Sequence, residues 1–182
     1  YFKTELTKNI KDIHHGPYRE ILKYFGCSKE NIEIIHTSDL PALSGLGSSS
    51  SSTVSAINAI ATLHGSFLSK KNLANLGIEI ERNILKESVG YQDQIFSAFG
   101  GFNSIKFRMN EDYVVEDLLS NKNKIDKLNK SSILIWSGQQ RHGQNLEKRK
   151  ITKIKKNLLD KNLKNIQKIS EKQHEEFVKS EW

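Results

Sequence analysis

The sequence predicts an α+β fold, because segments of helical and strand-like periodicity follow one another without regular alternation. Apolar residues recur at helical spacing in several long stretches, and short β-branched runs lie between them. The predicted order is helix, strand, helix, helix, strand, strand, strand, helix. This order is not a regular βαβ alternation.

The first half of the chain predicts mainly helices. Pro17 suits a first helical position and Gly26 a helix end, while N-I-E-I-I-H-T alternates as a strand does. The serine-rich segment after Gly47 continues into an apolar run that Gly65 ends, typical of a buried helix. The expected elements are a helix at 17–25, a strand at 31–37, and helices at 51–64 and about 70–87.

The second half predicts a hairpin, one strand and a long helical region. A short helix from Asp93 to Phe99 is expected to stop at Gly100-Gly101, and hairpin strands flank Asn110. S-I-L-I-W-S-G predicts a short buried strand at 132–138, and apolar spacing predicts helix over about 145–178. The polar, Lys/Asn-rich stretch 120–132 marks a boundary, which divides the chain into domains 1–129 and 130–182.

Composition narrows the class of protein. The chain has 182 residues, of which 36% are hydrophobic and 27% charged, which argues against disorder. It has no run of about 18 apolar residues that could cross a membrane. The one cysteine, Cys27, excludes a disulfide framework and any Cys-rich metal site, and suggests a reducing, cytoplasmic location. We expect Cys27 to be a small packing residue and His64 a helix cap.

The net charge of +7 belongs to the last third of the chain. Residues 120–182 hold 16 Lys/Arg against 7 Asp/Glu, whereas residues 1–119 hold 12 against 14. Aromatic residues are sparse where the charge is densest, so a solvated helix face explains the lysines better than a nucleic-acid surface. A non-catalytic basic module that binds RNA through residues 120–182 remains the alternative of another class.

The segment P-A-L-S-G-L-G-S-S-S-S-S, residues 41–52, carries the strongest chemical signal. Gly45 and Gly47 permit backbone conformations that a Cβ would block, and the serines lead directly into a helix. Unpaired amides and the positive end of the helix dipole would then form an anion site, most naturally for phosphate. A flexible Gly/Ser linker is the alternative, although linkers do not continue into apolar helices.

Two carboxylates, Glu81 and Asp93, give the second signal. Taken singly, Glu81 is typical of a solvated charge and Asp93 of a helix cap. Beside a phosphate loop they match the needs of phosphoryl transfer, which are a metal ligand and a carboxylate that orients or deprotonates the attacking hydroxyl.

At these residues the sequence resembles the GHMP small-molecule kinases. Their motif Pro-x-x-x-Gly-Leu-Gly-Ser-Ser is met from Pro41 to Ser49, and a Glu about a dozen residues before an Asp matches Glu81 and Asp93. Within the family the chain is most similar to the D-glycero-D-manno-heptose 7-phosphate kinases. That similarity lies in D-I-H-H-G-P-Y-R-E-I-L-K-Y-F-G, H-T-S-D-L-P-A-L-S-G-L-G-S-S-S-S and K-E-S-V-G-Y-Q-D-Q-I-F-S-A-F-G-G-F-N.

The resemblance implies a two-domain fold with ATP and Mg²⁺ bound at the glycine–serine segment. Ser49, with Ser48 as the other candidate, and Glu81 would hold magnesium, while Asp93 would face the acceptor hydroxyl. Gln92 and Arg141 are the candidate substrate contacts. The implied ATP-binding residues are Pro41, Ser44, Gly45, Leu46, Gly47, Ser48, Ser49 and Ser50.

The implied reaction transfers the γ-phosphate to the anomeric hydroxyl of the heptose 7-phosphate, giving the 1,7-bisphosphate for nucleotide-activated heptose and surface polysaccharide. Fucose, an N-acetylhexosamine or mevalonate are the alternative acceptors within the family. The expected partner is a small-molecule sugar phosphate, with no nucleic acid or membrane, and a homodimer is left open. The family's first strands and its third, Gly-rich motif are missing between Tyr1 and Trp182. We therefore expect an internal portion of a longer kinase, its N-terminal domain nearly complete and its C-terminal domain partial, and inactive alone.

Overall fold

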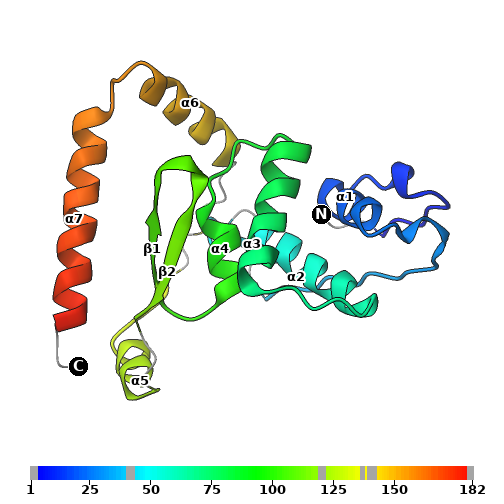
Figure 1. The fold of residues 1–182 in the computed structure, drawn as a ribbon, viewed down its shortest axis with the longest axis horizontal. Coiled ribbons are helices and arrows are strands. Elements are labelled where there is room, and N and C mark those ends of the chain that lie inside the picture. Colours follow the sequence, from blue (N-terminus) through cyan, green and yellow to red (C-terminus); the bar gives the residue numbers. More distant parts are fainter. Residues whose placement is uncertain (1–3, 40–43, 119–121, 136–137, 139–142, 180–182) are drawn as a thin grey trace. The chain divides into compact units, whose positions relative to one another are not determined.

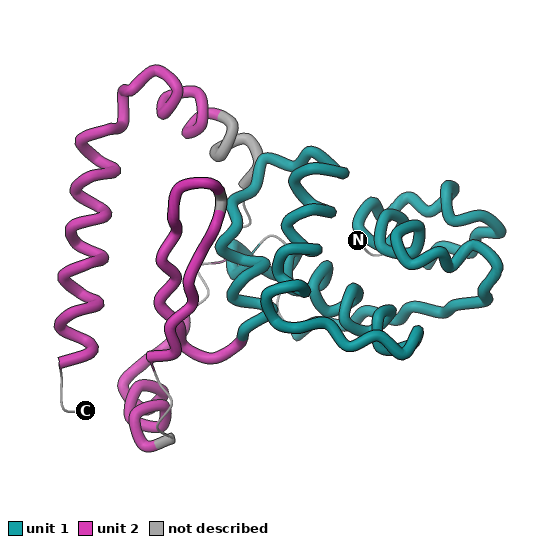
Figure 2. The backbone as a smooth tube through the Cα atoms, in the orientation of Figure 1, with its two compact units in different colours: residues 1–99, 139–144 teal, residues 100–138, 145–182 magenta. Residues whose placement is uncertain are grey.

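The computed structural model describes residues 4–39, 44–118, 122–135, 138 and 143–179 (Figure 1). The chain forms two compact units (Figure 2): residues 1–99 with 139–144, and residues 100–138 with 145–182. Each unit is described below by itself. Helices together with a small antiparallel sheet confirm the predicted α+β class.

The regular elements described in the first unit are all helical. Its first helix, α1, places Pro17 in the first turn, and the αL conformation of Gly26 (φ 73°) follows the helix end. The predicted helices at 17–25, 51–64 and 93–99 are confirmed to within a few residues. The elements are η1 (Ile10–Asp12), α1 (Gly16–Tyr24), η2 (Cys27–Lys29), α2 (Ser48–Leu63), α3 (Lys70–Ile78), η3 (Glu79–Ile84) and α4 (Gln92–Phe99).

The core of this unit lies where α2 packs against α1, α3 and α4. A Cβ at Gly77 of α3 would lie 3.1 Å from Val54 Cγ2 and 3.6 Å from Gln94 Cβ, so the three helices approach closely there. This close packing fixes the start of α4 relative to α2. The buried apolar cluster comprises Ile21, Leu22, Cys27, Val54, Ile57, Ile60, Leu73 and Ile80.

The predicted helix at 70–87 changes its winding part-way. After α3 the chain continues as the π-helical segment η3, in which Leu85 N–H donates to Ile80 O at 2.9 Å. Ile80 and Glu81 are both buried, at 0% and 1% exposure. Single π-turns occur often at functional sites, because they turn a side chain away from its regular helical direction.

The prediction of a strand at 31–37 is wrong, because these residues form neither helix nor strand. A strand requires a neighbour that completes its backbone hydrogen bonds. The described residues pair only β1 with β2, and both belong to the second unit. The alternation of Ile32 and Ile34 therefore indicates an apolar pattern only, and without a ladder partner the segment forms no strand.

The second unit is built on the predicted hairpin. Strands β1 (Asn103–Phe107) and β2 (Tyr113–Asp117) pair antiparallel, with Ile105 opposite Val115, and the turn contains Asn110 in the αL region (φ 68°). The Phe102 and Phe177 rings pack with centroids 5.1 Å apart, which ties α7 to the start of the hairpin. The other elements are η4 (Met109–Glu111), α5 (Lys122–Lys130), α6 (Gly143–Lys155) and α7 (Asp160–Lys179).

Two expectations for this part are wrong. Residues 132–135 form no strand, and Ile133 is 87% exposed in place of the expected burial. The helical region at 145–178 is two helices, α6 and α7, separated around Asn157, whose φ of 57° is incompatible with a continuous helix. Apolar residues recur at helical spacing in each of the two helices, so the spacing alone predicts helix on both sides and does not mark where one helix ends.

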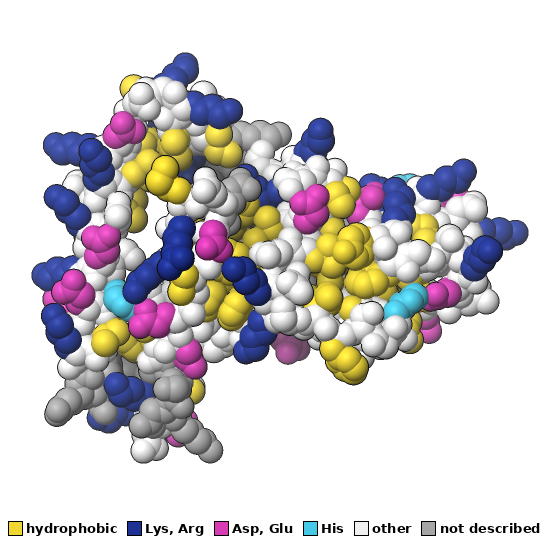
Figure 3. All heavy atoms as spheres, in the orientation of Figure 1, with side chains coloured by type: hydrophobic (Ala, Val, Ile, Leu, Met, Phe, Trp, Pro, Cys, Tyr) yellow, Lys and Arg dark blue, Asp and Glu magenta, His cyan; other side chains and the backbone are white. Residues whose placement is uncertain are grey.

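The surface of α7 is charged but mixed. Figure 3 shows basic side chains, which are all lysines in α7, interspersed with acidic ones along the helix. Ion pairs such as Lys172–Glu176, at 3.6 Å, form along it. None of the described helices is long and apolar enough to span a membrane. The boundary predicted between 129 and 130 stays a prediction, since it concerns the domains of the whole protein.

Candidate active site

The glycine–serine segment forms the N-terminus of α2. Gly45 and Gly47 both adopt positive φ, 78° and 71°, and Gly47 is the N-cap of the helix. The first i to i−4 bond runs from Ser51 N–H to Gly47 O at 3.0 Å. The amides of Ser48, Ser49 and Ser50 therefore have no partner within the helix. Gly47, the N-cap residue, has no side chain that could accept a hydrogen bond from them.

A second feature of this turn is a buried hydroxyl group without a hydrogen-bond partner. Ser44 Oγ is buried and has no hydrogen-bond partner among the described residues. A hydroxyl that is buried without a partner is costly unless a ligand or water satisfies it. Together with the amides at the start of α2 it offers groups that suit a phosphate, and the phosphate-binding role of this turn stays a prediction.

Asp93 lies against this turn. A Cβ placed on Gly47 would come within 3.3 Å of Asp93 Cγ and 3.4 Å of Oδ2. Asp93 belongs to the first turn of α4 and is exposed, so its carboxylate is accessible to a bound molecule. Two residues far apart in the sequence are thus brought into contact, and the glycine is what leaves room for the carboxylate.

Glu81 lies deeper, under the first turns of α2 and α4. Its Oε2 accepts a hydrogen bond from Ser50 Oγ at 2.8 Å and another from Gln94 Nε2. All three side chains are buried, with exposures of 1% for Glu81, 5% for Ser50 and 0% for Gln94. The buried carboxylate therefore links η3, α2 and α4 at the base of the turn that Gly47 begins.

The second oxygen of this carboxylate, Glu81 Oε1, is buried and has no partner among the described residues. A buried anionic oxygen that lacks a donor favours a cation, and carboxylate and hydroxyl oxygens are ligands that Mg²⁺ accepts. The donor set thus fits the magnesium expected from the sequence. Burial raises the pKa of the neighbouring Glu87 carboxyl, and the Glu81 carboxylate raises it further, as two close acidic groups do.

The structure distinguishes among the predicted residues. Gly47, Ser50, Glu81 and Asp93 come together, Ser48 is half-buried, and Ser49, Leu46 and Gln92 are exposed. Glu81 contacts Ser50 and not Ser49, so the assignment of Ser49 as the magnesium ligand stays a prediction, as does the role of Gln92. Pro41 and Arg141 lie outside the described residues.

Sequence reasoning missed two residues of this region. Gln94 donates to Glu81, and the signal that could have found it is its place beside Asp93 in Q-D-Q. Tyr18 reaches α2 from α1, with its hydroxyl 3.0 Å from Ser52 Oγ. No spacing in the sequence reveals that contact, because 34 residues separate the partners.

Comparison with known families decides the identity of this part of the chain. The family model described as "GHMP kinases N terminal domain" matches residues 12–101, a range that contains Gly47, Glu81 and Asp93. Residues 12–101 are a GHMP kinase N-terminal domain. The fold class expected from the resemblance is thereby confirmed.

Individual GHMP kinases are similar at modest identity. The D-glycero-alpha-D-manno-heptose 7-phosphate kinase of Campylobacter jejuni is 32% identical over 143 residues, which cover 79% of this chain and 42% of that protein. A mevalonate kinase of Pyrococcus horikoshii is 34% identical over 103 residues, 56% of this chain and 30% of that protein. The chain spans less than half the length of these relatives.

A solved GHMP kinase structure agrees with the same assignment. The crystal structure of a D-glycero-D-manno-heptose 1-phosphate kinase from Bacteroides thetaiotaomicron superposes with a TM-score of 0.54 at 33% identity, covering 68% of this chain and 40% of that one. All three named relatives are kinases. In this GHMP kinase domain, the glycine–serine turn, Glu81 and Asp93 are the residues on which a function can be argued.

Proposed function

We propose that the protein is an ATP-dependent sugar kinase that phosphorylates a hydroxyl of a heptose phosphate. The observation that carries this proposal is the contact of the Asp93 carboxylate with Gly47 at the N-terminus of α2. A group that can orient an acceptor hydroxyl thus lies next to amides that can hold phosphate. Both kinds of group are needed within a few ångströms for transfer between them.

In the proposed mechanism, the amides of Ser48, Ser49 and Ser50 donate to the phosphate oxygens of ATP. Magnesium, held by Glu81 with a serine of the same turn, would neutralise the charge on those oxygens. Asp93 orients the acceptor hydroxyl and takes its proton as the new O–P bond forms and the bond to ADP breaks. Gln94 and Ser50 keep Glu81 in place through their hydrogen bonds.

The proposed acceptor is the anomeric hydroxyl of D-glycero-D-manno-heptose 7-phosphate, which gives the 1,7-bisphosphate. Two relatives support a heptose phosphate, although one is named for the 7-phosphate and the other for the 1-phosphate. Phosphorylation of a heptose 1-phosphate at O7 would give the same bisphosphate, so the substrate must be tested directly. Such a product would supply nucleotide-activated heptose for surface polysaccharide, and we place the reaction in the cytoplasm, where ATP is abundant.

A coupled assay of ADP release by the full-length protein tests this function. It compares heptose 7-phosphate, heptose 1-phosphate and mevalonate, the last because mevalonate kinases are 34% identical to this chain. The proposal expects turnover with heptose 7-phosphate at a kcat/KM at least about tenfold above either competitor. Preferred turnover of mevalonate would indicate a mevalonate kinase instead. Preferred turnover of heptose 1-phosphate would indicate that the phosphate is transferred to O7.

We expect Glu81→Gln to raise the magnesium concentration needed for half-maximal activity, because a neutral amide is a weaker ligand for a hard cation than a carboxylate. The titration is measured at saturating ATP. Glu79→Gln is the matched control, since Glu79 lies two residues earlier and is exposed. An unchanged magnesium dependence in an active Glu81→Gln variant would contradict the ligand assignment.

A further inference from the structure

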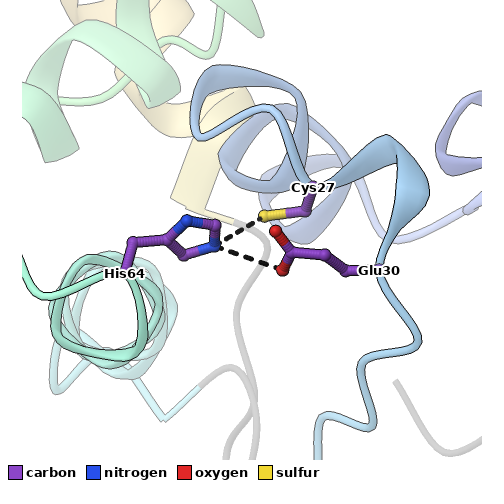
Figure 4. Close-up of side chains that lie close together, drawn as sticks. All are labelled: Cys27, Glu30 and His64. Carbon is purple, nitrogen blue, oxygen red and sulfur yellow. Dashed lines mark hydrogen bonds and ion pairs between the residues drawn. The ribbon is translucent and has the colours of Figure 1, made fainter.

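Three side chains converge at the other end of α2 from the glycine–serine turn (Figure 4). His64 is the C-cap of that helix, Cys27 lies in η2 and Glu30 directly follows η2. The Cys27 sulfur lies 3.4 Å from His64 Nε2, and Glu30 Oε2 lies 3.3 Å from the same nitrogen. One ligand atom from each residue lies within 4.8 Å of the other two.

The packing of α1 against α2 brings these residues together. Gly26 in the αL conformation turns the chain after α1 into η2. Cys27 is 2% exposed and belongs to the apolar core, whereas the His64 and Glu30 side chains are 26% and 42% exposed. The cluster therefore has a buried sulfur on its inner side and a face open to solvent.

The shared nitrogen decides what the cluster can do. A nucleophilic Cys–His–carboxylate arrangement uses both ring nitrogens, one toward the sulfur and the other toward the carboxylate. Here the sulfur and the carboxylate face the same atom, His64 Nε2, and one N–H cannot be directed at both (Figure 4). Three ligand atoms that lie within 4.8 Å of one another are instead arranged as the ligands of one metal ion would be.

The distances also fit a tetrahedral ion. With Zn–S about 2.3 Å and Zn–N and Zn–O about 2.0 Å, tetrahedral angles separate sulfur from nitrogen by about 3.5 Å and nitrogen from oxygen by about 3.3 Å. The observed separations are 3.4 Å and 3.3 Å. A thiolate, an imidazole and a carboxylate form a donor set that favours Zn²⁺ over Mg²⁺ or Ca²⁺.

We infer that Cys27, Glu30 and His64 form a zinc site, with a water molecule as the fourth ligand on the open face. Binding releases the Cys27 thiol proton to solvent as the S–Zn bond forms, and thiolate plus carboxylate then balance the charge of the ion. Burial raises the pKa of this thiol, so the ion competes with a firmly held proton. The ion would link η2 to the C-terminal end of α2, at the opposite end of that helix from the glycine–serine turn.

Metal titration of the tag-free protein tests this inference without any assay of activity. Because Cys27 is the only cysteine of the 182 residues, a thiolate-to-Co²⁺ charge-transfer band that disappears in Cys27→Ala reports this site. We expect one Co²⁺ per chain with this band, its displacement by Zn²⁺, and a rise in Tm with Zn²⁺. Cys27→Ala abolishes the band, and Glu30→Gln weakens metal affinity at least about tenfold.

The control is His14→Gln. His14 Nδ1 also lies 3.3 Å from a carboxylate oxygen, Glu5 Oε2, but this pair is not part of the cluster of Cys27, Glu30 and His64. This variant keeps the band and the Tm shift. Glu30→Gln replaces an exposed side chain, so it tests the site even if Cys27→Ala lowers stability. Absence of the band in the wild type, or an equal metal affinity in Glu30→Gln, would overturn the inference.

Discussion

Asp93→Asn is expected to reduce kcat by at least about 10² while leaving the affinity for Mg-ATP nearly unchanged. Asparagine keeps the shape of the side chain beside Gly47, where a Cβ would lie 3.3 Å from the Asp93 carboxyl carbon. It removes the charge that orients the acceptor hydroxyl and accepts its proton. Steady-state kinetics with the heptose phosphate and calorimetric titration of Mg-ATP separate the two effects.

Asp12→Asn is the control for loss of a carboxylate elsewhere in the same unit. Asp12 is an exposed residue of η1 that accepts a hydrogen bond from Asn9 at 3.0 Å. This variant should turn over as the wild type does. Wild-type kcat in Asp93→Asn would remove Asp93 from the mechanism, and a matching loss of ATP affinity would assign it to nucleotide binding instead.

Gly47→Val is expected to lower Mg-ATP affinity far more than it lowers the stability of the free protein. A non-glycine residue at φ 71° costs roughly 1–2 kcal/mol. A second effect is steric, because the new Cβ would lie 3.3 Å from Asp93 Cγ. We expect the added side chain also to hinder phosphate binding at the α2 amides, which begin at the next residue. Thermal melts with and without Mg-ATP measure both quantities on one sample.

Gly65→Val provides the matched comparison. Gly65 has the same φ of 71° and follows the other end of α2, but a Cβ there meets nothing within 4 Å. The backbone strain is thus alike, and only the contact differs. Both variants should lose the stability that the backbone strain costs, and Gly47→Val should lose somewhat more because of its contact with Asp93. Gly65→Val keeps the full Mg-ATP shift in Tm. A full shift in Gly47→Val as well would favour the flexible-linker interpretation of this segment.

The candidate site is predictable where its chemistry is local. Glycines directly before a helix indicate a turn with positive φ and free amides at the start of that helix. Gly45 and Gly47 adopt that conformation. The position of Glu81 beside Ile80 predicts a carboxylate at the edge of an apolar stripe. Its full burial could not be predicted, since the π-helical winding of η3 changes which residues face the core and leaves no mark in the apolar spacing.

What the sequence could not supply depends on contacts between distant residues. The choice of Ser50 over Ser49 as the partner of Glu81 depends on the rotation of α2 about its axis. The strands expected at 31–37 and 132–138 fail, in the residues that the structure describes, because alternation does not reveal a pairing neighbour. His64 caps a helix as expected, but its meeting with Cys27, 37 residues away, follows only from the packing of α1 on α2.

The most direct test of the account is an amide NMR titration of the full-length protein with Mg²⁺ and a non-hydrolysable ATP analogue. The account predicts that the largest saturable shifts fall on the amides of Ser48, Ser49 and Ser50, which lack partners within α2. Smaller shifts should reach Asp93, which lies against Gly47. Saturable shifts confined to other segments, with residues 47–50 unchanged, would contradict the assignment of this turn as the phosphate site.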